Sequence, residues 1–100
     1  MESQYVLLRD IPSRNGDSVC IQGWVLHCRS SGKLIFIEVR DGTGIIQCVV
    51  FKGNVSSEVF DKCKKLTLES SIIVEGQINR DTRSKVGFEI AVKENRNSAL

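Results

Sequence analysis

The fold is decided by the stretch Arg29-Ser-Ser-Gly-Lys-Leu-Ile-Phe-Ile-Glu-Val-Arg-Asp-Gly-Thr-Gly-Ile-Ile-Gln47. Between residues 34 and 39 apolar and other side chains alternate, which is typical of a strand with one buried face. The core face carries Ile35, Ile37 and Val39. The other face carries Phe36 and Glu38, so this strand is predicted to display an aromatic ring on its wetter side.

The dipeptide Asp41-Gly42 predicts a hairpin turn after this strand, because a type I′ turn needs positive φ at both central residues and both residue types tolerate it. With a two-residue loop, Phe36 lies opposite Gln47. A four-residue loop through Gly44 moves the partners by two residues but leaves Phe36 and Gln47 on one face. An aromatic ring beside an amide suits a splayed-out nucleobase. The basic residues of the stretch are Arg29, Lys33 and Arg40.

Length and composition limit what the chain can be. One hundred residues form one domain with a single core, and a net charge of +2 is too small for a protein that holds duplex DNA by charge alone. Any contact with nucleic acid is therefore expected to be local. The four cysteines form no Cys-x-x-Cys pair, and the only histidine is His27, so we expect reduced thiols and no metal site. The chain has no signal-peptide pattern and no run of eighteen apolar residues, which predicts a cytoplasmic protein without a membrane span.

The rest of the chain predicts four more strands and one helix. Gly23 inside the first strand predicts a bulge or sharp coil, and Ser56 is a plausible helix N-cap. The expected strands are 19–29, 34–39, 45–51, 72–79 and 88–92, with the helix between the third and the fourth. We expect residues 1–16 to be a loosely docked lead-in, 17–93 the folded domain and 94–100 a flexible tail.

This element order, β-β-β-α-β-β, predicts an all-β fold with one helix, the five-stranded Greek-key OB-fold barrel. SH3-like barrels also contain five short strands, so the order alone does not decide. Position favours the OB-fold, whose oligonucleotide surface is formed by its second and third strands and by two loops. Phe36 and Gln47 lie on those two strands. The candidate nucleic-acid-binding residues are Phe36, Gln47, Arg29, Lys33, Glu38, Arg40, Asn79, Arg80, Arg83 and Lys85.

Spaced residues across the chain resemble one family. From about residue 15 to 93 the sequence is similar to the N-terminal anticodon-binding domain of class IIb aminoacyl-tRNA synthetases, which comprise the aspartyl, asparaginyl and lysyl enzymes. The residues that carry the resemblance are Gly23-Trp24-Val25, Arg29, Gly32, Phe36, Arg40-Asp41-Gly42-Thr43-Gly44 and Gln47. Within the family, the asparaginyl enzymes are most similar at Arg29-Ser30-Ser31-Gly32-Lys33, Ile46-Gln47-Cys48 and Leu66-Thr67-Leu68-Glu69-Ser70-Ser71.

The resemblance implies roles for these residues. Phe36 would stack on the middle uracil of the anticodon, while Gln47 and Arg29 would read or clamp that base. Glu38 would select a neighbouring base, and the segment 79–85 would contact the third base or the phosphates. Many relatives carry a basic residue where this chain has Cys28, which implies fewer phosphate contacts on that side.

The resemblance also implies partners. The chain would bind the anticodon stem-loop of a tRNA, that for asparagine first. It would work beside the catalytic domain of a parent synthetase, which could form a homodimer. No residue here resembles a catalytic motif, so this chain is expected to be a binding domain and not an enzyme. It would hold no cofactor, and ATP and magnesium would belong to the catalytic domain.

Other functions fit the residues as well. The chain is alternatively the anticodon-binding domain of an aspartyl or lysyl enzyme, or a general single-stranded nucleic-acid-binding OB protein. A third alternative is an OB domain for protein interaction, in which a partner covers Phe36. Trp24 is expected to be structural, packing against the barrel wall.

Overall fold

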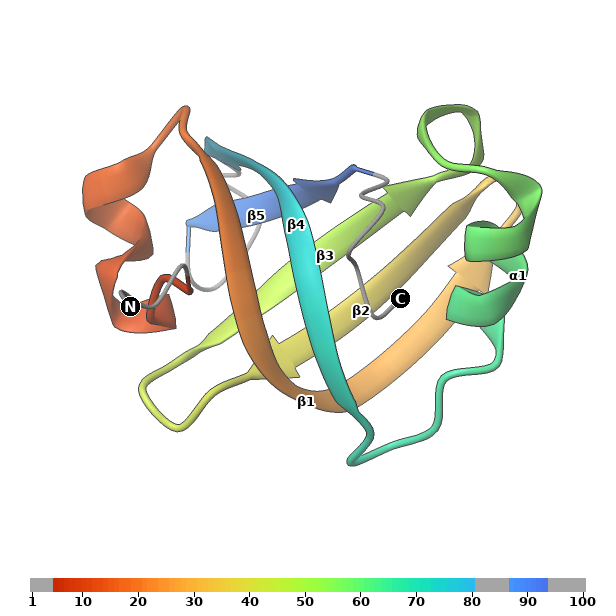
Figure 1. The fold of residues 1–100 in the computed structure, drawn as a ribbon, viewed down its shortest axis with the longest axis horizontal. Helices are drawn as coiled ribbons and strands as arrows, with labels where there is room; N and C mark the ends of the chain where they lie inside the picture. Colours follow the sequence, from red (N-terminus) through yellow and green to blue (C-terminus); the bar gives the residue numbers. More distant parts are fainter. Residues whose placement is uncertain (1–4, 81–86, 94–100) are drawn as a thin grey trace.

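The computed structural model describes residues 5–80 and 87–93, and it confirms the OB-fold (Figure 1). Five strands close into a barrel in the order β1-β2-β3-β5-β4, with β4 pairing back to β1. All pairs are antiparallel except β3 with β5. The elements are the 3-10 helix η1 (Leu8–Arg14), β1 (Ser18–Ser31), β2 (Leu34–Arg40), β3 (Ile45–Phe51), the 3-10 turn η2 (Lys52–Asn54), α1 (Ser57–Lys64), β4 (Ser71–Arg80) and β5 (Phe88–Val92).

Strand β1 is long enough to serve two sides of the barrel. Its first half pairs with β4 and its second half with β2, and Trp24 pairs with both neighbours. One residue earlier, a Cβ on Gly23 would lie 2.3 Å from the carbonyl oxygen of Arg40. The backbones approach so closely at this crossing that only glycine fits.

A β-bulge in β1 decides which way Arg29 points. The pairing with β2 shifts between Val25 and His27, so Leu26 is the extra residue. We expected the bulge at Gly23, and it lies three residues later. Before the bulge the odd-numbered residues, ending at Val25, are buried in the core. After it Arg29 pairs with the outward-facing Phe36, whereas an unbroken alternation would direct its side chain into the core.

The β2–β3 hairpin has the wider of the two loops that the sequence allows. Arg40 pairs with Ile45, so residues 41–44 form the loop, and the two-residue register is wrong. The Asp41 carboxylate explains the choice, because its Oδ1 accepts hydrogen bonds from the backbone of Thr43 at 2.8 Å and of Gly44 at 3.2 Å. These bonds stabilise a turn that is capped by the Asp41 side chain, and this turn replaces the predicted type I′ turn.

The barrel interior is filled by alternating residues of all five strands, and no polar side chain is buried in the described part of the chain. Helix α1 packs across one end (Figure 1). Ser56 caps it as predicted, accepting a hydrogen bond from the backbone of Val59 at 3.2 Å. Phe60 and Cys63 are the buried residues of the helix, and burial of a phenylalanine contributes about 1.5 to 3 kcal/mol.

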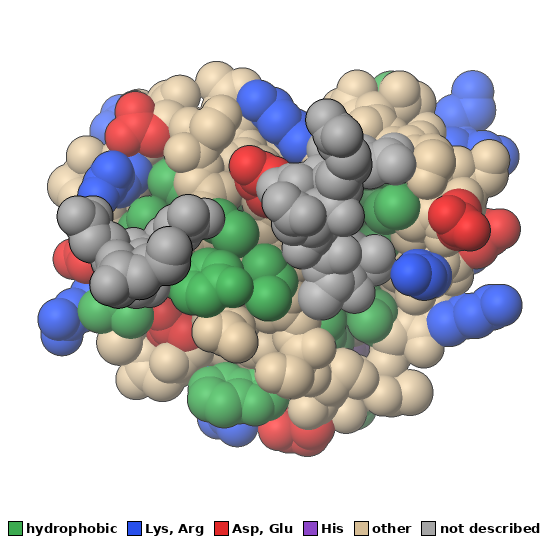
Figure 2. Space-filling view, viewed as in Figure 1, with side chains coloured by type: hydrophobic (Ala, Val, Ile, Leu, Met, Phe, Trp, Pro, Cys, Tyr) green, Lys and Arg blue, Asp and Glu red, His purple; other side chains and the backbone are tan. Residues whose placement is uncertain are grey.

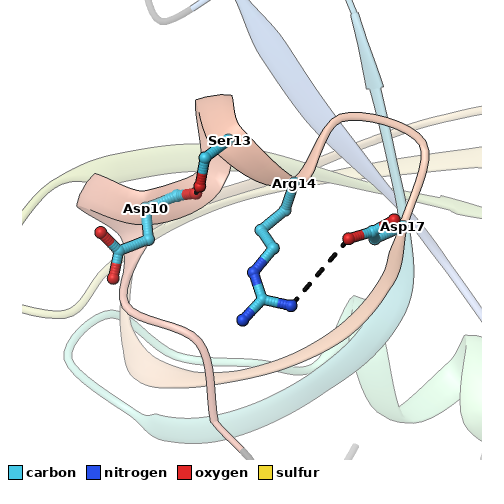
Figure 3. Close-up of polar contacts among 4 residues, drawn as sticks. All are labelled: Asp10, Ser13, Arg14 and Asp17. Atoms are coloured by element: carbon cyan, nitrogen blue, oxygen red, sulfur yellow. Dashed lines mark hydrogen bonds and ion pairs between the residues drawn. The ribbon is translucent and has the colours of Figure 1, made fainter.

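Within the segment before the barrel, η1 is closely packed, in contrast to the loose docking that we expected. Helix η1 lies at the end of the barrel opposite α1 (Figure 1), with Leu8 and Ile11 in the core. The backbone N–H of Leu8 donates to Asp41 Oδ2 at 2.8 Å, which joins η1 to the hairpin loop. Figure 3 shows the polar side of this segment, where Arg14 reaches Asp17 at 3.9 Å. Both partners are about half exposed, so this ion pair adds little stability.

Strand β4 ends at Arg80, so Asn79 lies in the strand as expected and Arg80 belongs to the strand and not to the loop that was predicted after it. Arg83 and Lys85, the other basic residues of that predicted loop, lie outside the described residues. Across residues 5–80 and 87–93, no helix is long and apolar enough to span a bilayer.

Candidate nucleic-acid interface

The outer face of β1, β2 and β3 brings Arg29 and Phe36 into direct contact. The two residues pair across the strands, and the Arg29 guanidinium carbon lies 4.3 Å from the centre of the Phe36 ring. Phe36 is half-buried, so the strand supports the ring from below while part of it reaches the surface. The confirmed alternation of β2 places this ring outside the barrel, since its neighbours Ile35 and Ile37 are fully buried.

A row of polar residues crosses the same face one step toward the hairpin loop. Register partners run from strand to strand: His27 with Glu38, Glu38 with Gln47, Gln47 with Glu89, and Glu89 with Asn79. Gln47 therefore lies next to Glu38 and diagonal to Phe36. The alternation in β2 and β3 predicted that Phe36, Glu38 and Gln47 share a face, and the structure confirms it.

Two members of this row, His27 and Glu89, were absent from the predicted site. Glu89 was identifiable from its alternation with the buried Ile90. His27 was not, because its direction depends on the bulge at Leu26.

The hairpin tip, residues 40–45, is separate from this cluster. Arg40 lies four residues from Phe36 along β2, about 13 Å away. Its guanidinium pairs with Glu69 at 3.7 Å, and not with Asp41 or Glu38. The structure therefore does not bring Arg40 together with the other predicted residues of β1 to β3.

The Asp41 carboxylate at the tip is fully engaged. Its partial burial raises the pKa, but hydrogen bonds from the Leu8 backbone, from the hydroxyl and backbone of Thr43 and from the Gly44 backbone outweigh this effect and lower the pKa below its ordinary value. The charged form is thus favoured by the fold. Asp41 stabilises the tip, and its carboxylate is not available to a ligand.

The open end of the hairpin, residues 33–34 and 51–52, carries exposed positive charge. Lys33 follows the Gly32 turn, and its carbonyl accepts a hydrogen bond from the Lys52 backbone at 2.9 Å. Both lysines are exposed, and neither side chain forms an ion pair within the described ranges. The predicted Lys33 thus borders the stacking face, and Lys52 adds a second cation that sequence reasoning passed over.

At the far side of the sheet, Asn79 and Arg80 end β4. Asn79 faces outward in the polar row, two strands from Gln47. The Arg80 guanidinium lies 5.9 Å from the Phe88 ring at the rim of the barrel. Asn79 therefore borders this face from the side opposite Arg29, whereas Arg80, in phase with the buried Ile78, lies at the rim.

We expected Trp24 to pack against the barrel wall, but the structure leaves much of its side chain exposed. It is 43% exposed and lines a shallow cavity of about 430 Å³ together with Tyr5 and Leu7 of the N-terminal segment. Figure 2 shows apolar side chains reaching the surface at the end of the molecule where that segment lies. Trp24 pairs with Arg40, so this apolar region lies toward the hairpin tip from the polar row.

The cysteines are all free, as the sequence predicted. Burial, together with Cys63 and Glu89 nearby, raises the pKa of Cys48 to about 12, and burial with Cys28 nearby raises that of Cys63 to about 11. These thiols are protonated at neutral pH and are not poised as nucleophiles.

Comparison with known proteins identifies the family of this chain. The family model described as an OB-fold nucleic acid binding domain, of the tRNA anticodon type, matches residues 19–96. This chain belongs to that family. It is an anticodon-binding OB domain that closely matches the N-terminal region of asparagine–tRNA ligases.

The relatives agree on this assignment. The asparagine–tRNA ligase of Herpetosiphon aurantiacus is 50% identical over 92 residues, which are 92% of this chain and 20% of the relative. The crystal structure of asparaginyl-tRNA synthetase from Pyrococcus horikoshii superposes with a TM-score of 0.85 at 42% identity, covering 91% of this chain and 22% of that one. An aspartyl-tRNA synthetase from Entamoeba histolytica shares the fold, with 24% identity and a TM-score of 0.80. The match covers 90% of this chain and 20% of that one. The chain thus spans about a fifth of the length of the curated ligases that it matches.

Proposed function

We propose that this domain binds the anticodon loop of the tRNA for asparagine and recognises the middle uracil. Phe36 stacks on the base, and Gln47 and Arg29 read its edge. The observation that supports this most directly is the surface ring of Phe36 with Arg29 above it and Gln47 diagonal to it. Unpaired RNA loops are recognised in this way, by stacking on aromatic side chains and by hydrogen bonds to exposed base edges.

The hydrogen-bonding groups of the two polar residues suit uracil. A uracil edge offers two carbonyl acceptors around one N–H donor, and the Gln47 amide can accept from that N–H and donate to one carbonyl. The amide alone does not exclude cytosine, since a flipped amide fits its edge as well. Arg29 has only donors, so a guanidinium held beside position 4 of the base favours the uracil carbonyl over the amino group that cytosine has there. The pair of residues therefore discriminates better than either one.

Stacking has to compete with the contact between Arg29 and Phe36. An exposed cation–π contact is worth about 0.5 to 1 kcal/mol. A stacked base is worth about 1 to 3 kcal/mol. A uracil that displaces the guanidinium from the ring therefore still gains free energy. The released Arg29 then donates to the base edge or to a phosphate.

The remaining predicted residues serve the neighbouring bases. Glu38 lies beside Gln47, and its carboxylate suits a base that presents N–H groups. Asn79 and Arg80, with Arg83 and Lys85 beyond the described residues, supply contacts to the third base or to phosphates. Catalysis, with its ATP and magnesium, is proposed to belong to the other four-fifths of a ligase of the length of the relatives.

Titration with RNA tests the proposal. A seventeen-nucleotide anticodon stem-loop carrying GUU is compared at low salt with the same hairpin carrying cytosine in the middle position. We expect the uracil hairpin to bind more tightly by about 1 to 3 kcal/mol. Equal affinities would contradict anticodon reading and leave a general single-strand binder. Absence of binding to either hairpin would favour a protein-interaction domain.

A variant connects that preference to the site. Gln47→Ala is expected to reduce the preference for uracil over cytosine, because only Arg29 then reads the edge. Leu68→Ala is the control, because it removes a 61% exposed apolar side chain that lies outside β1, β2 and β3. Its preference for uracil should stay that of wild type. An unchanged preference in Gln47→Ala would remove Gln47 from the proposal.

A further inference from the structure

A second aromatic ring lies on the same outer face as Phe36. Phe51 is the last residue of β3 and alternates with the buried Cys48 and Val50. It is 41% exposed, so a large part of the side chain lies at the surface. Its orientation follows from the same alternation that places Gln47 on this face.

The register sets the relation of the two rings. Phe36 pairs with Val49, and Phe51 is the next outward residue of β3, paired with Leu34. Diagonal neighbours on one face of an antiparallel pair are about 7 to 8 Å apart. Aromatic residues on adjacent strands at such positions hold successive unstacked bases in sheet-based RNA-binding domains. Phe51 therefore extends the Phe36 surface toward the open end.

The turn after β3 fixes the place of this ring. A Cβ on Gly53 would lie 2.6 Å from Cε2 of Phe51, so the ring rests where a side chain at position 53 would otherwise be. The η2 turn thus supports one side of the ring. The exposed remainder is available to a ligand.

The charges around Phe51 favour RNA over a protein partner. Lys52 follows Phe51 in the chain and Lys33 precedes Leu34, the register partner of Phe51, and the backbone bond between the two lysines holds both at the open end. Neither is neutralised by an ion pair within residues 5–80 and 87–93. An aromatic ring with exposed cations at neighbouring positions combines base stacking with attraction to phosphates.

We propose that Phe51 is a second base-stacking residue, which binds the nucleotide that follows the middle base toward the open end, with Lys33 and Lys52 on its phosphates. The inference rests on the proposed function, since it extends the same RNA along the same face.

Abasic substitutions in the stem-loop test the inference with the intact chain. The affinities of wild type, Phe51→Ala, Phe51→Leu and Phe36→Ala are measured for the GUU hairpin and for hairpins lacking one loop base at a time. Phe51→Ala is expected to weaken binding to the intact hairpin about 5- to 140-fold, which corresponds to the stacking of one base. Phe51→Leu keeps apolar area without a ring and should lose nearly as much. Gly53→Ala, which displaces the ring without removing it, should show a smaller loss.

The position of the lost base separates the possible outcomes. The effect of Phe51→Ala should disappear for one abasic hairpin, and that position should differ from the one that abolishes the effect of Phe36→Ala. Wild-type affinity in Phe51→Ala, or an equal loss on every abasic hairpin, would overturn the inference. If Phe36→Ala still shows its own position-specific loss in that case, the proposed function survives. Thermal melting of each variant, with Leu68→Ala as control, confirms that the domain is folded.

Discussion

The two ends of the β2–β3 hairpin use their polar side chains in opposite ways. At the tip, the Asp41 carboxylate accepts hydrogen bonds from Leu8, Thr43 and Gly44, and Arg40 pairs with Glu69. At the open end, Lys33 and Lys52 are exposed and lack an ion pair in the described part of the chain. One pair of strands thus carries polar groups that hold the fold together and others that remain available to a ligand.

The two ends also differ in what they pack against. The tip joins η1, the 3-10 helix that inserts Leu8 and Ile11 into the core (Figure 1). The open end lies on the side of α1 (Figure 1), and Lys33, Phe51 and Lys52 are exposed there. Substitutions at the tip should therefore alter stability, and substitutions toward the open end should alter RNA affinity.

Removal of the Asp41 carboxylate should have the largest effect on stability. Asp41→Ala leaves the backbone N–H groups of Leu8, Thr43 and Gly44 without their acceptor, which is expected to cost about 2 to 3 kcal/mol of unfolding free energy. Urea denaturation measures this loss. RNA affinity of the folded variant should be unchanged, and a large loss of affinity at full stability would contradict the division between the two ends.

Acid should also lower the unfolding free energy, but by less than Asp41→Ala does, because a protonated carboxyl keeps part of its hydrogen bonds. The pKa of Asp41 is lowered from 3.8, so its contribution is fully present above about pH 4 and is lost as the pH falls through the lower value of the folded state. Urea midpoints of wild type and Asp41→Asn should therefore converge as the pH falls below 4. A constant difference down to pH 2 would show that the charge of Asp41 does not contribute.

Loss of a lysine at the open end should affect RNA and not stability. Lys33→Gln and Lys52→Gln are each expected to weaken hairpin binding by less than about 1 kcal/mol and to lower the salt slope by about 0.7 per lost phosphate contact. Titrations between low and physiological salt measure both quantities. Lys62→Gln on α1 is the matched control, and an equal change in its salt slope would indicate a diffuse charge effect.

The ion pair at the tip should have the smallest effect. Arg40 and Glu69 are separated by 3.7 Å, with side chains 48% and 67% exposed, so Arg40→Gln should cost less than about 0.5 kcal/mol of stability. Its RNA affinity should stay close to that of wild type. A loss as large as that of Lys33→Gln would place Arg40 in the RNA surface, as the sequence alone suggested.

Alternation was sufficient to predict the binding face, since period-two patterns in β2 and β3 fix the side of Phe36 and Gln47 in either hairpin register. It was not sufficient for Arg29, whose direction depends on an extra residue at Leu26 that no local signal marks. The loop length depended on the bonds of Asp41, one of which comes from Leu8, a residue 33 positions away. The packing of η1 was missed because Leu8 and Ile11 form only one apolar turn in a polar segment.

The most direct test of the account is a double-mutant cycle between Phe36→Ala and an abasic middle position in the GUU stem-loop. If Phe36 stacks on the middle uracil, each change alone should weaken binding by about 1 to 3 kcal/mol, and the two together should cost little more than one. A combined loss equal to the sum of the two single losses would contradict the account.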